Sequence, residues 1–238
     1  MQARDRLIVA LDLSSRDEIL LLVDELHGVA STFKIGLQAF VNNGPSIVRE
    51  IDARGERVFL DLKIHDIPNT AKHAVAAASS LGASFVTVHA AGGGAMLRAC
   101  AESAGATLIL GVTILTSIDE GELLRIGLGG TPVSNAVNLA RLVRESGLRG
   151  VVASAHEIAA IREGCGSELV IVTPGIRDAG SDVNDQRRTM SARQAIDAGA
   201  DYIVVGRPIT EAKNRRDAAM RIVDELGQTR TSGPLAIA

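Results

Sequence analysis

Aromatic side chains are scarce in this chain, and their scarcity narrows its possible functions. Phe, Trp and Tyr together make up 2% of the 238 residues, and Trp is missing altogether. Proteins that bind single-stranded nucleic acid usually stack the bases on aromatic rings. The formal net charge of −3 also gives no sign of attraction to a phosphate backbone or an anionic membrane. We therefore expect no nucleic acid and no membrane among the partners of this protein.

Cysteine and long apolar runs are also lacking. The two cysteines, Cys100 and Cys165, lie far apart and without the close spacing of metal ligands. A disulfide between them is possible, but reduced thiols in or near the core are the better interpretation. No segment reaches the ~18 uninterrupted apolar residues of a membrane-spanning helix. Asp12 interrupts the apolar start of the chain before it resembles a signal peptide, so the sequence predicts a cytoplasmic protein.

What the chain does contain is a regular alternation of two kinds of segment. Short apolar runs rich in β-branched residues predict strands, and the longer amphipathic or alanine-rich runs between them predict helices. Near-continuous apolar strands separated by helices indicate a parallel sheet covered on both faces. Eight such units favour an α/β fold of the closed (β/α)₈ TIM barrel type over a doubly wound open sheet. The strands are expected at 7–13, 33–36, 58–63, 85–90, 107–115, 150–154, 169–176 and 202–209.

The helices and loops complete this organisation. A helix should open at Ser14 or Ser15, which suit an N-cap, and another at Pro68. We expect one domain over residues 1–238, because no linker rich in Pro, Gly or Ser divides the chain, with 228–238 as a loose tail. Two long connections, one of which could include a short helix, are places for ligand contacts or a lid. These connections are 116–131 and 177–190, and further helices are expected at 92–104, 132–147, 156–163, 191–199 and 210–227.

Charged residues gather where the first three predicted strands end. Asp12 ends the first strand and Lys34 lies in the second, while Asp61 and Lys63 lie in the third, with Asp66 just beyond. Strand alternation places Asp61 and Lys63 on one face and the leucines beside them on the other. Leucines suit the side that faces the helices, so the charges should point into the mouth of the barrel, where TIM barrels have active sites. Solvated surface charges are the alternative, but five residues on three strands favour a functional array.

The last two strands predict a phosphate site. Gly206 would let a ligand approach the backbone closely, and Arg207 is a bidentate donor for phosphate oxygens. The loops after the seventh and eighth strands of such barrels often bind phosphate. Additional polar and basic side chains in the preceding loop are Arg177, Gln186, Arg187 and Arg188. No histidine pair has metal-ligand spacing with a carboxylate partner, so His65 and His89 should have structural or surface roles and no metal site is predicted.

The run DLKIHDIPNT resembles the D-x-K-x-x-D signature of the orotidine 5′-phosphate decarboxylase family. The resemblance covers nearly the whole chain, in order, without a departure at the key positions. Its other parts are ALD, FKIG, TVHA, VTILTS, VTPGIR and VVGRPI, each at the end of a predicted strand or within it. The resemblance implies decarboxylation of orotidine 5′-phosphate to UMP, the last step of de novo pyrimidine synthesis, without a metal or organic cofactor.

The resemblance also implies a role for individual residues. Lys63 is the expected proton donor to C6 of the pyrimidine, and Asp61 is expected near the substrate carboxylate. Lys34 and Asp66 complete the charge network, and Asp66 and Thr70 are expected to reach into the partner subunit's site, which makes the enzyme a homodimer with shared sites. The remaining contacts that the resemblance implies are Asp12 and Lys34 with ribose hydroxyls, Thr116 with the pyrimidine, and Gln186, Gly206 and Arg207 with phosphate, with Arg177 nearby.

Two other functions compete with this one. A sugar-phosphate decarboxylase or aldolase of the same superfamily shares the third-strand motif but stabilises an enediolate with Mg²⁺, using an acidic residue in the second strand. Lys34 stands at that position here and would repel the cation. A non-catalytic sensor of phosphate ligands would need the phosphate residues without the paired Asp61 and Lys63. Decarboxylation fits these charges better, because a carbanion without a cofactor needs electrostatic stabilisation and a prompt proton.

Overall fold

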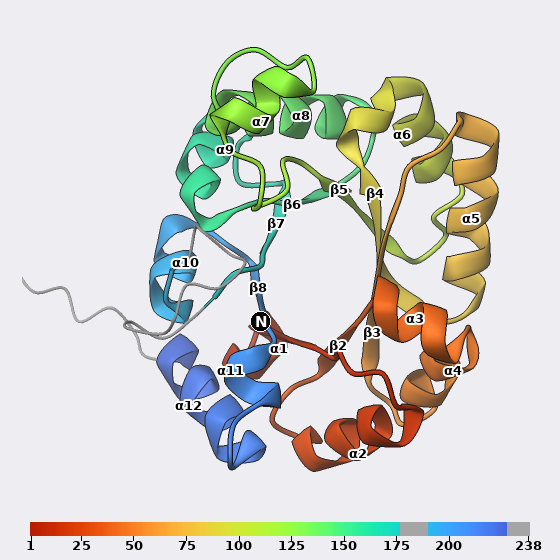
Figure 1. Ribbon diagram of the computed structural model, residues 1–238, viewed down its shortest axis with the longest axis vertical. Coiled ribbons are helices and arrows are strands. Elements are labelled where there is room, and N and C mark those ends of the chain that lie inside the picture. The colour runs from red at the N-terminus through yellow and green to blue at the C-terminus, as the bar shows by residue number, and fades with distance from the viewer. Residues whose placement is uncertain (177–189, 228–238) are drawn as a thin grey trace, which may run out of the picture.

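The computed structural model describes residues 1–176 and 190–227, and its strands close into a parallel barrel (Figure 1). Each strand pairs with the next in chain order, and β8 closes the ring by pairing with β1. The strands are β1 (Leu7–Ala10), β2 (Thr32–Gly36), β3 (Arg57–Ile64), β4 (Ala83–His89), β5 (Leu108–Val112), β6 (Gly150–Val152), β7 (Val170–Thr173) and β8 (Tyr202–Val205). The predicted (β/α)₈ TIM barrel is therefore confirmed.

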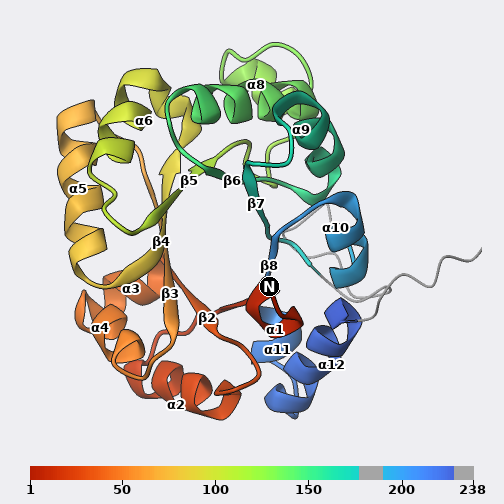
Figure 2. The ribbon, with the colours of Figure 1, turned by 180° about the vertical axis from the view of Figure 1, so that it is seen from behind.

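A ring of helices surrounds the barrel on all sides, as two opposite views show (Figure 1 and Figure 2). The helices of the described residues are α1 (Ala3–Arg6), α2 (Arg16–Leu26), α3 (Leu37–Asn43), α4 (Ser46–Asp52), α5 (Pro68–Ser80), α6 (Gly93–Glu102), α7 (Glu120–Arg125), α8 (Pro132–Glu145), α9 (Ile158–Cys165), α10 (Ala192–Ala198), α11 (Arg207–Thr210) and α12 (Arg215–Gly227), with the 3₁₀ turns η1 (Ala90–Gly92) and η2 (Ala155–Glu157). Short helices follow β2 and β8, and α7 lies in the long connection after β5, for which the sequence allows a short helix.

The core has two layers, which alternate along each strand. Phe59 of β3 belongs to the cluster that fills the barrel, where its ring meets that of Phe85 edge to face at 5.9 Å. Leu60, the next residue, belongs to the larger cluster between strands and helices. Phe59 is 1% exposed, and burial of a side chain of this size contributes about 1.5–3 kcal/mol. The alternation that directs Phe59 inward also directs Asp61, two residues further on, toward the mouth.

Several element boundaries differ from the expected ones. The predicted strand 202–209 ends at Val205, because the following residues turn into α11, which contains Pro208 in its first turn. Proline has no N–H for a sheet but suits the first turn of a helix. The alternation of strands and helices implies one helix between the second and third strands, without a range, whereas the structure has two, α3 and α4. Of these, α3 buries a single residue, Ala39, and exposes Leu37 and Val41, so it has no amphipathic period to detect.

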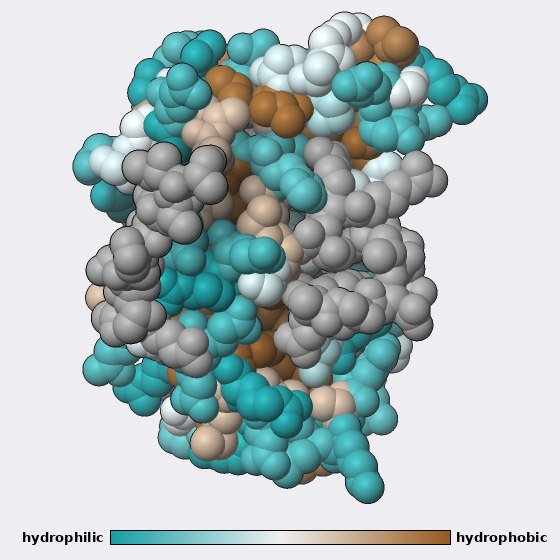
Figure 3. All heavy atoms as spheres, turned by 90° about the vertical axis from the view of Figure 1, so that its left-hand side faces the viewer, coloured by the Kyte–Doolittle hydropathy of each residue, from teal (hydrophilic) through white to brown (hydrophobic). Residues whose placement is uncertain are grey.

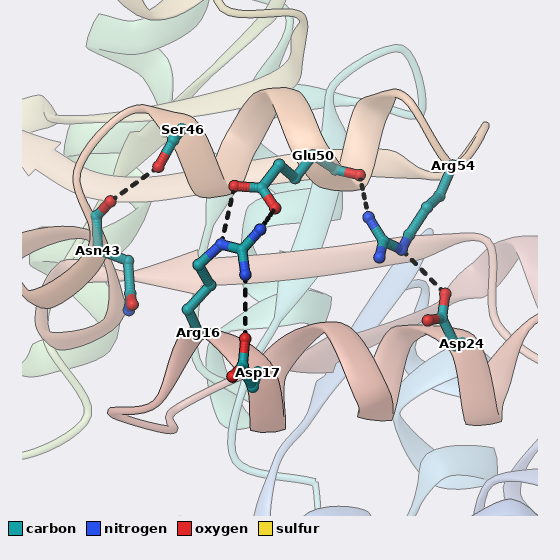
Figure 4. A network of polar contacts seen from close by, with 7 residues as sticks. All are labelled: Arg16, Asp17, Asp24, Asn43, Ser46, Glu50 and Arg54. Carbon is teal, nitrogen blue, oxygen red and sulfur yellow. Dashed lines mark hydrogen bonds and ion pairs between the residues drawn. The ribbon is translucent and has the colours of Figure 1, made fainter.

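A polar network joins two of the helices that cover β2 and β3 (Figure 4). The guanidinium of Arg16 on α2 donates to the carboxylate of Glu50 on α4 and to Asp17 beside it. Arg54 donates to Asp24 at 2.9 Å and to the carbonyl oxygen of Glu50 at 2.8 Å. Charge pairs on an open surface stabilise a fold only modestly. The network therefore aligns α2 with α4 rather than supplying most of their stability, which comes from their buried apolar faces.

Both cysteines are enclosed in the fold, and the outer surface is largely polar. Cys100 and Cys165 are free and buried, as expected, and burial raises the pKa of the Cys100 thiol to about 11. Seen from the side of α9, α10 and α12, the visible surface of the described residues is mostly hydrophilic, with apolar residues near its upper end and in its middle (Figure 3). Within the described residues, no helix combines the length and apolar character needed to span a bilayer. The expected tail, 228–238, and most of the second long connection, 177–189, lie outside the described residues.

Candidate active site

Four charged side chains meet at the mouth of the barrel, where β1, β2 and β3 end. The Nζ atom of Lys63 lies 2.9 Å from both carboxylate oxygens of Asp61. On the other side of the same carboxylate, the Nζ atom of Lys34 lies 3.6 Å from Oδ2 of Asp61. The Lys34 ammonium also donates to Oδ1 of Asp12 at 3.2 Å. The result is an array of alternating charge, Asp12–Lys34–Asp61–Lys63, built from three adjacent strands.

Asp61 is the buried centre of this array. Its side chain is 13% exposed, and that of Lys34 is 11% exposed. Burial by itself would raise the pKa of Asp61, but the ammonium groups of Lys34 and Lys63 and hydrogen bonds from Lys63 and Thr87 outweigh it and lower the pKa below its usual value. Asp61 is therefore a carboxylate at neutral pH, held between two cations in a site of low dielectric.

The backbone of Lys63 is unusual. With φ of 52°, it is the one non-glycine residue of the described chain with a positive φ. The pairing of β3 with β4 is also irregular here, because Leu60 pairs with Val86 but Ile64 with Val88. Bulges of this kind often occur beside active sites, where they redirect a side chain. The bulge therefore explains how Lys63 can turn its ammonium back toward Asp61, two residues earlier in the same strand.

The charge array forms one wall of a cavity of about 290 Å³ at the carboxyl ends of the strands. Thr116, from the connection after β5, lines the cavity as well, and so do Gly206 and Arg207, which follow β8. Apolar side chains also line the cavity, among them Val112, Ile114, Val152 and Ile176. A cavity lined by apolar side chains together with a few charged and polar groups is typical of a binding site for a small polar ligand.

Most of the predicted site residues within the described part of the chain come together in this cavity. Those that line it are Asp12, Lys34, Asp61, Lys63, Thr116, Gly206 and Arg207. Two others do not line it, namely Asp66 and Thr70, which are exposed just before α5 and in its first turn. The carboxylate of Asp66 accepts a hydrogen bond from the N–H group of Ile67 at 2.7 Å. The remaining predictions fall on Arg177, Gln186, Arg187 and Arg188, which lie outside the described residues.

Two residues near the array were not predicted to take part in it. The hydroxyl of Thr87 on β4 donates to Oδ1 of Asp61 at 2.9 Å and accepts from the N–H group of Lys63 at 2.8 Å. The ring of His89 lies 5.3 Å from that of His65, centroid to centroid. Burial, followed by the nearby His65 and Lys63, lowers the pKa of His89, which is therefore a neutral imidazole beside the array at neutral pH. In the sequence, Thr87 looks like an ordinary residue of an apolar strand. The only sign of its role is that its strand is expected to pair with the strand that carries the D-x-K motif.

Comparisons with known proteins agree with this geometry. The model of the family described as "Orotidine 5'-phosphate decarboxylase / HUMPS family" matches residues 5–222. A protein of Heliobacterium modesticaldum named orotidine 5'-phosphate decarboxylase is 45% identical over 96% of this chain and 98% of its own length. One of the same name from Moorella thermoacetica is 49% identical over 95% of this chain and 94% of its own.

A solved structure gives the same result. The orotidine 5'-phosphate decarboxylase of Lactobacillus acidophilus is 33% identical, with a TM-score of 0.84, over 94% of this chain and 100% of that one. The likeness therefore extends through the barrel and the strand ends that form the cavity. The chain belongs to the orotidine 5'-phosphate decarboxylase / HUMPS family.

Proposed function

We propose that this protein is a carboxy-lyase that converts orotidine 5′-phosphate to UMP in de novo pyrimidine synthesis, without a metal or organic cofactor. Membership of the family and the names of its relatives support this reaction. The observation that carries the proposal is the ionised Asp61 between the ammonium groups of Lys34 and Lys63, on the wall of a cavity that suits a nucleotide.

The array fits the demands of the chemistry. When the bond between C6 and the carboxylate breaks, CO₂ leaves and the electron pair stays on C6, which has no adjacent group to accept it. The ammonium of Lys63 would stabilise this charge and then donate a proton to C6, and water would later return a proton to the amine. Asp61 would lie against the substrate carboxylate, and the repulsion between the two would be relieved as CO₂ leaves.

The residues that follow β8, next to the Asp12 end of the array, would hold the phosphate. Arg207 offers two parallel N–H donors, and Gly206 lets a phosphate oxygen approach the backbone. Phosphate binding far from C6 can supply energy that the enzyme uses to hold the reacting ring against the charge array. The other proposed contacts are Asp12 and Lys34 with the ribose, Thr116 with the pyrimidine, and Gln186 and Arg177 with the phosphate.

A homodimer with shared sites is part of the proposal. Asp66 and Thr70 do not line the cavity of their own chain, and both are exposed, as a contribution to a second chain requires. The apolar side chains of Leu37, Val41 and Ile67 are 61%, 72% and 67% exposed. Large exposed apolar groups beside a site commonly mark an interface.

We also propose a single domain over residues 1–238 and a cytoplasmic location. The pairing of β1 with β8 supports a single domain, because it joins the two ends of the described chain in one barrel. Two buried free thiols suit a reducing compartment.

The Mg²⁺-dependent alternative is disfavoured by the charge on β2. In that chemistry an acidic residue of the second strand holds the cation, whereas Lys34 stands here and is committed to Asp12 and Asp61. A non-catalytic sensor is disfavoured because burying Asp61 with two cations serves no purpose in holding a phosphate at Gly206 and Arg207.

The experiment is to purify the protein and measure UMP formation from orotidine 5′-phosphate with and without EDTA. We expect turnover that EDTA does not change. A Lys63→Ala preparation, purified in the same way, controls for a decarboxylase carried over from the host. Loss of activity with EDTA would favour the sugar-phosphate alternative, and binding of the nucleotide without turnover would favour the sensor.

A further inference from the structure

Thr87 occupies a singular place in the sheet, opposite the bulge of β3. Leu60 pairs with Val86 and Ile64 pairs with Val88, so the three residues 61–63 of β3 face Thr87 alone on β4. Extra residues in a bulge lose the regular backbone hydrogen bonds of the ladder. The N–H group of Lys63 is one that needs another acceptor, because an unpaired amide in a partly buried position is costly.

The side chain of Thr87 supplies that acceptor and a donor as well. Its Oγ1 atom accepts from the N–H group of Lys63 at 2.8 Å and donates to Oδ1 of Asp61 at 2.9 Å. Thr87 is fully buried, at 0% exposure, so water does not compete for either bond. A hydroxyl can donate one hydrogen bond and accept two, so both interactions form at once.

The conformation of Lys63 indicates that the Thr87 hydroxyl does more than occupy space in the core. A lysine with φ of 52° is strained, since the side chain of a non-glycine residue crowds its own backbone in the left-handed region. Strain of this kind persists only where the surroundings fix it, and it is typical of active sites. The bond from the Lys63 amide to Thr87 holds the peptide group just before this strained residue.

We infer that Thr87 is a positioning residue for the proposed decarboxylation, whose hydroxyl holds the Lys63 backbone and the Asp61 carboxylate in the one arrangement that aims the Lys63 ammonium at the substrate. The inference rests on the proposed function. Thr87 does not line the cavity, so it acts through Lys63 and Asp61 and not on the substrate itself. One buried oxygen on a neighbouring strand thereby orients both members of the acid–carboxylate pair.

Two comparisons isolate the effect of the hydroxyl: wild type with Thr87→Val, and Thr87→Ser with Thr87→Ala. Thr87→Val removes the hydroxyl and keeps the branched shape, and Thr87→Ser keeps the hydroxyl and loses the methyl group. Thr87→Ala completes the set, because it differs from the serine variant by one oxygen atom only. Thr32→Val is the matched control, since Thr32 is a fully buried threonine at the start of β2 whose Oγ1 atom has no hydrogen-bond partner among the described residues.

We expect kcat to fall in the variants that lack the hydroxyl oxygen atom of residue 87 and to remain near wild type in those that keep it. In Thr87→Val, kcat for orotidine 5′-phosphate should fall by about 10- to 100-fold, because two buried hydrogen bonds to the reacting pair are lost. The affinity for UMP should change by less than about threefold, because the phosphate wall is intact. Thr87→Ser should keep kcat within about threefold of wild type, Thr87→Ala should lose it, and Thr32→Val should keep it.

The pH dependence of kcat gives a second readout that packing alone would not move. Asp61 faces Lys34 from β2, Lys63 from β3, and His89 from β4 with His65 beside it, and Asp12 reaches it through Lys34. The hydroxyl of Thr87 helps to lower the pKa of Asp61, after the larger effects of the two lysines. Its removal should therefore move the acid limb of kcat, measured at saturating substrate, to higher pH in Thr87→Val and not in Thr32→Val.

Each outcome decides the inference. Wild-type kcat and an unmoved acid limb in a folded Thr87→Val protein would overturn it, as would equal losses in the serine and alanine variants. If Thr87→Val does not fold, the serine and alanine variants make the same comparison. A wild-type protein that does not decarboxylate orotidine 5′-phosphate at all would instead overturn the proposed function.

Discussion

At the scale of single residues, the site depends on charges that burial would otherwise suppress. A lone carboxylate as buried as Asp61 would favour its protonated form, but two nearby ammonium groups lower its pKa and keep it ionised. The same cations cannot both relax, because Lys34 is also bound to Asp12 and Lys63 is fixed by a strained backbone. Charges fixed in this way need little reorganisation when the transition state forms, which is how electrostatic catalysis lowers a barrier.

Lys63→Ala should remove turnover almost completely and leave the fold intact. The ammonium faces the cavity and takes no part in the apolar clusters, so its loss creates no void between strands and helices. The measurement is kcat for UMP formation, together with the melting temperature. A variant that keeps more than about a tenth of wild-type kcat, which corresponds to ~1.4 kcal/mol of barrier, contradicts the role of proton donor.

Arg207→Ala should weaken UMP binding much more than uridine binding. The variant loses a charged, bidentate hydrogen bond to the phosphate of UMP. Uridine has no phosphate, so its binding does not depend on this contact. Calorimetric titration of both ligands measures the difference, and KM for orotidine 5′-phosphate should rise with the Kd for UMP. Equal losses for UMP and uridine would move Arg207 out of the phosphate site.

At the scale of elements, hydrophobic periodicity predicts what apolar packing determines and little else. The eight strands were predictable because their residues fill the barrel or face the helices, and the inward direction of Asp61 follows from the same alternation. Neither α3 nor the bulge of β3 has such a signal. The helix exposes apolar residues, and the bulge is held by one hydroxyl, that of Thr87, which has no distinctive pattern. Polar contacts between distant strands are decided by the closed fold and not by local sequence.

Gly36, the last residue of β2, shows how closely the elements approach one another at the site. A Cβ atom at this position would lie 3.0 Å from Oδ1 of Asp12 and 3.1 Å from Nζ of Lys34. Gly36→Ala should therefore separate Lys34 from Asp12 and lower kcat/KM by about threefold to tenfold, because small displacements of reacting groups are expensive.

The control for this variant is Gly227→Ala at the end of α12, since among the described residues the Cβ position there meets only the Cβ atom of Ala3, at an ordinary contact distance of 3.7 Å, and its backbone does not need glycine. Steady-state kinetics of both variants, with their melting temperatures, make the comparison. Unchanged kinetics in Gly36→Ala would mean that the pairing of Lys34 with Asp12 has no part in the reaction.

At the scale of the whole molecule, the cavity of one chain is incomplete under the proposed function. Asp66 and Thr70 are exposed, stand near the exposed apolar Ile67, and do not line the cavity of their own chain. In a symmetric dimer each chain would supply these two residues to the other. Catalysis would then depend on assembly, and dilution below the dimer dissociation constant would reduce specific activity.

Mixing two inactive variants tests this arrangement. In a heterodimer of Lys63→Ala and Asp66→Ala chains, one site carries both lesions and the other site carries neither. Statistical exchange of subunits should therefore restore about a quarter of wild-type activity, measured per site. Size-exclusion chromatography and a tag on one variant confirm that exchange has taken place. Exchange without recovery of activity would assign Asp66 to the site of its own chain.

The pairing of β1 with β8 has a consequence for how the molecule is made. Leu7 pairs with Ile203, so the first strand to leave the ribosome has an open edge until almost the last strand has been synthesised. The charge array comes from the first three strands, and Arg207 follows the last strand. A chain truncated before β8 therefore contains the residues of the array but lacks the arginine proposed to bind phosphate. Closure over so long a stretch of sequence is slow compared with local contacts. Activity should thus appear all at once during translation, and an interrupted synthesis leaves an inactive, aggregation-prone chain with an unpaired strand edge.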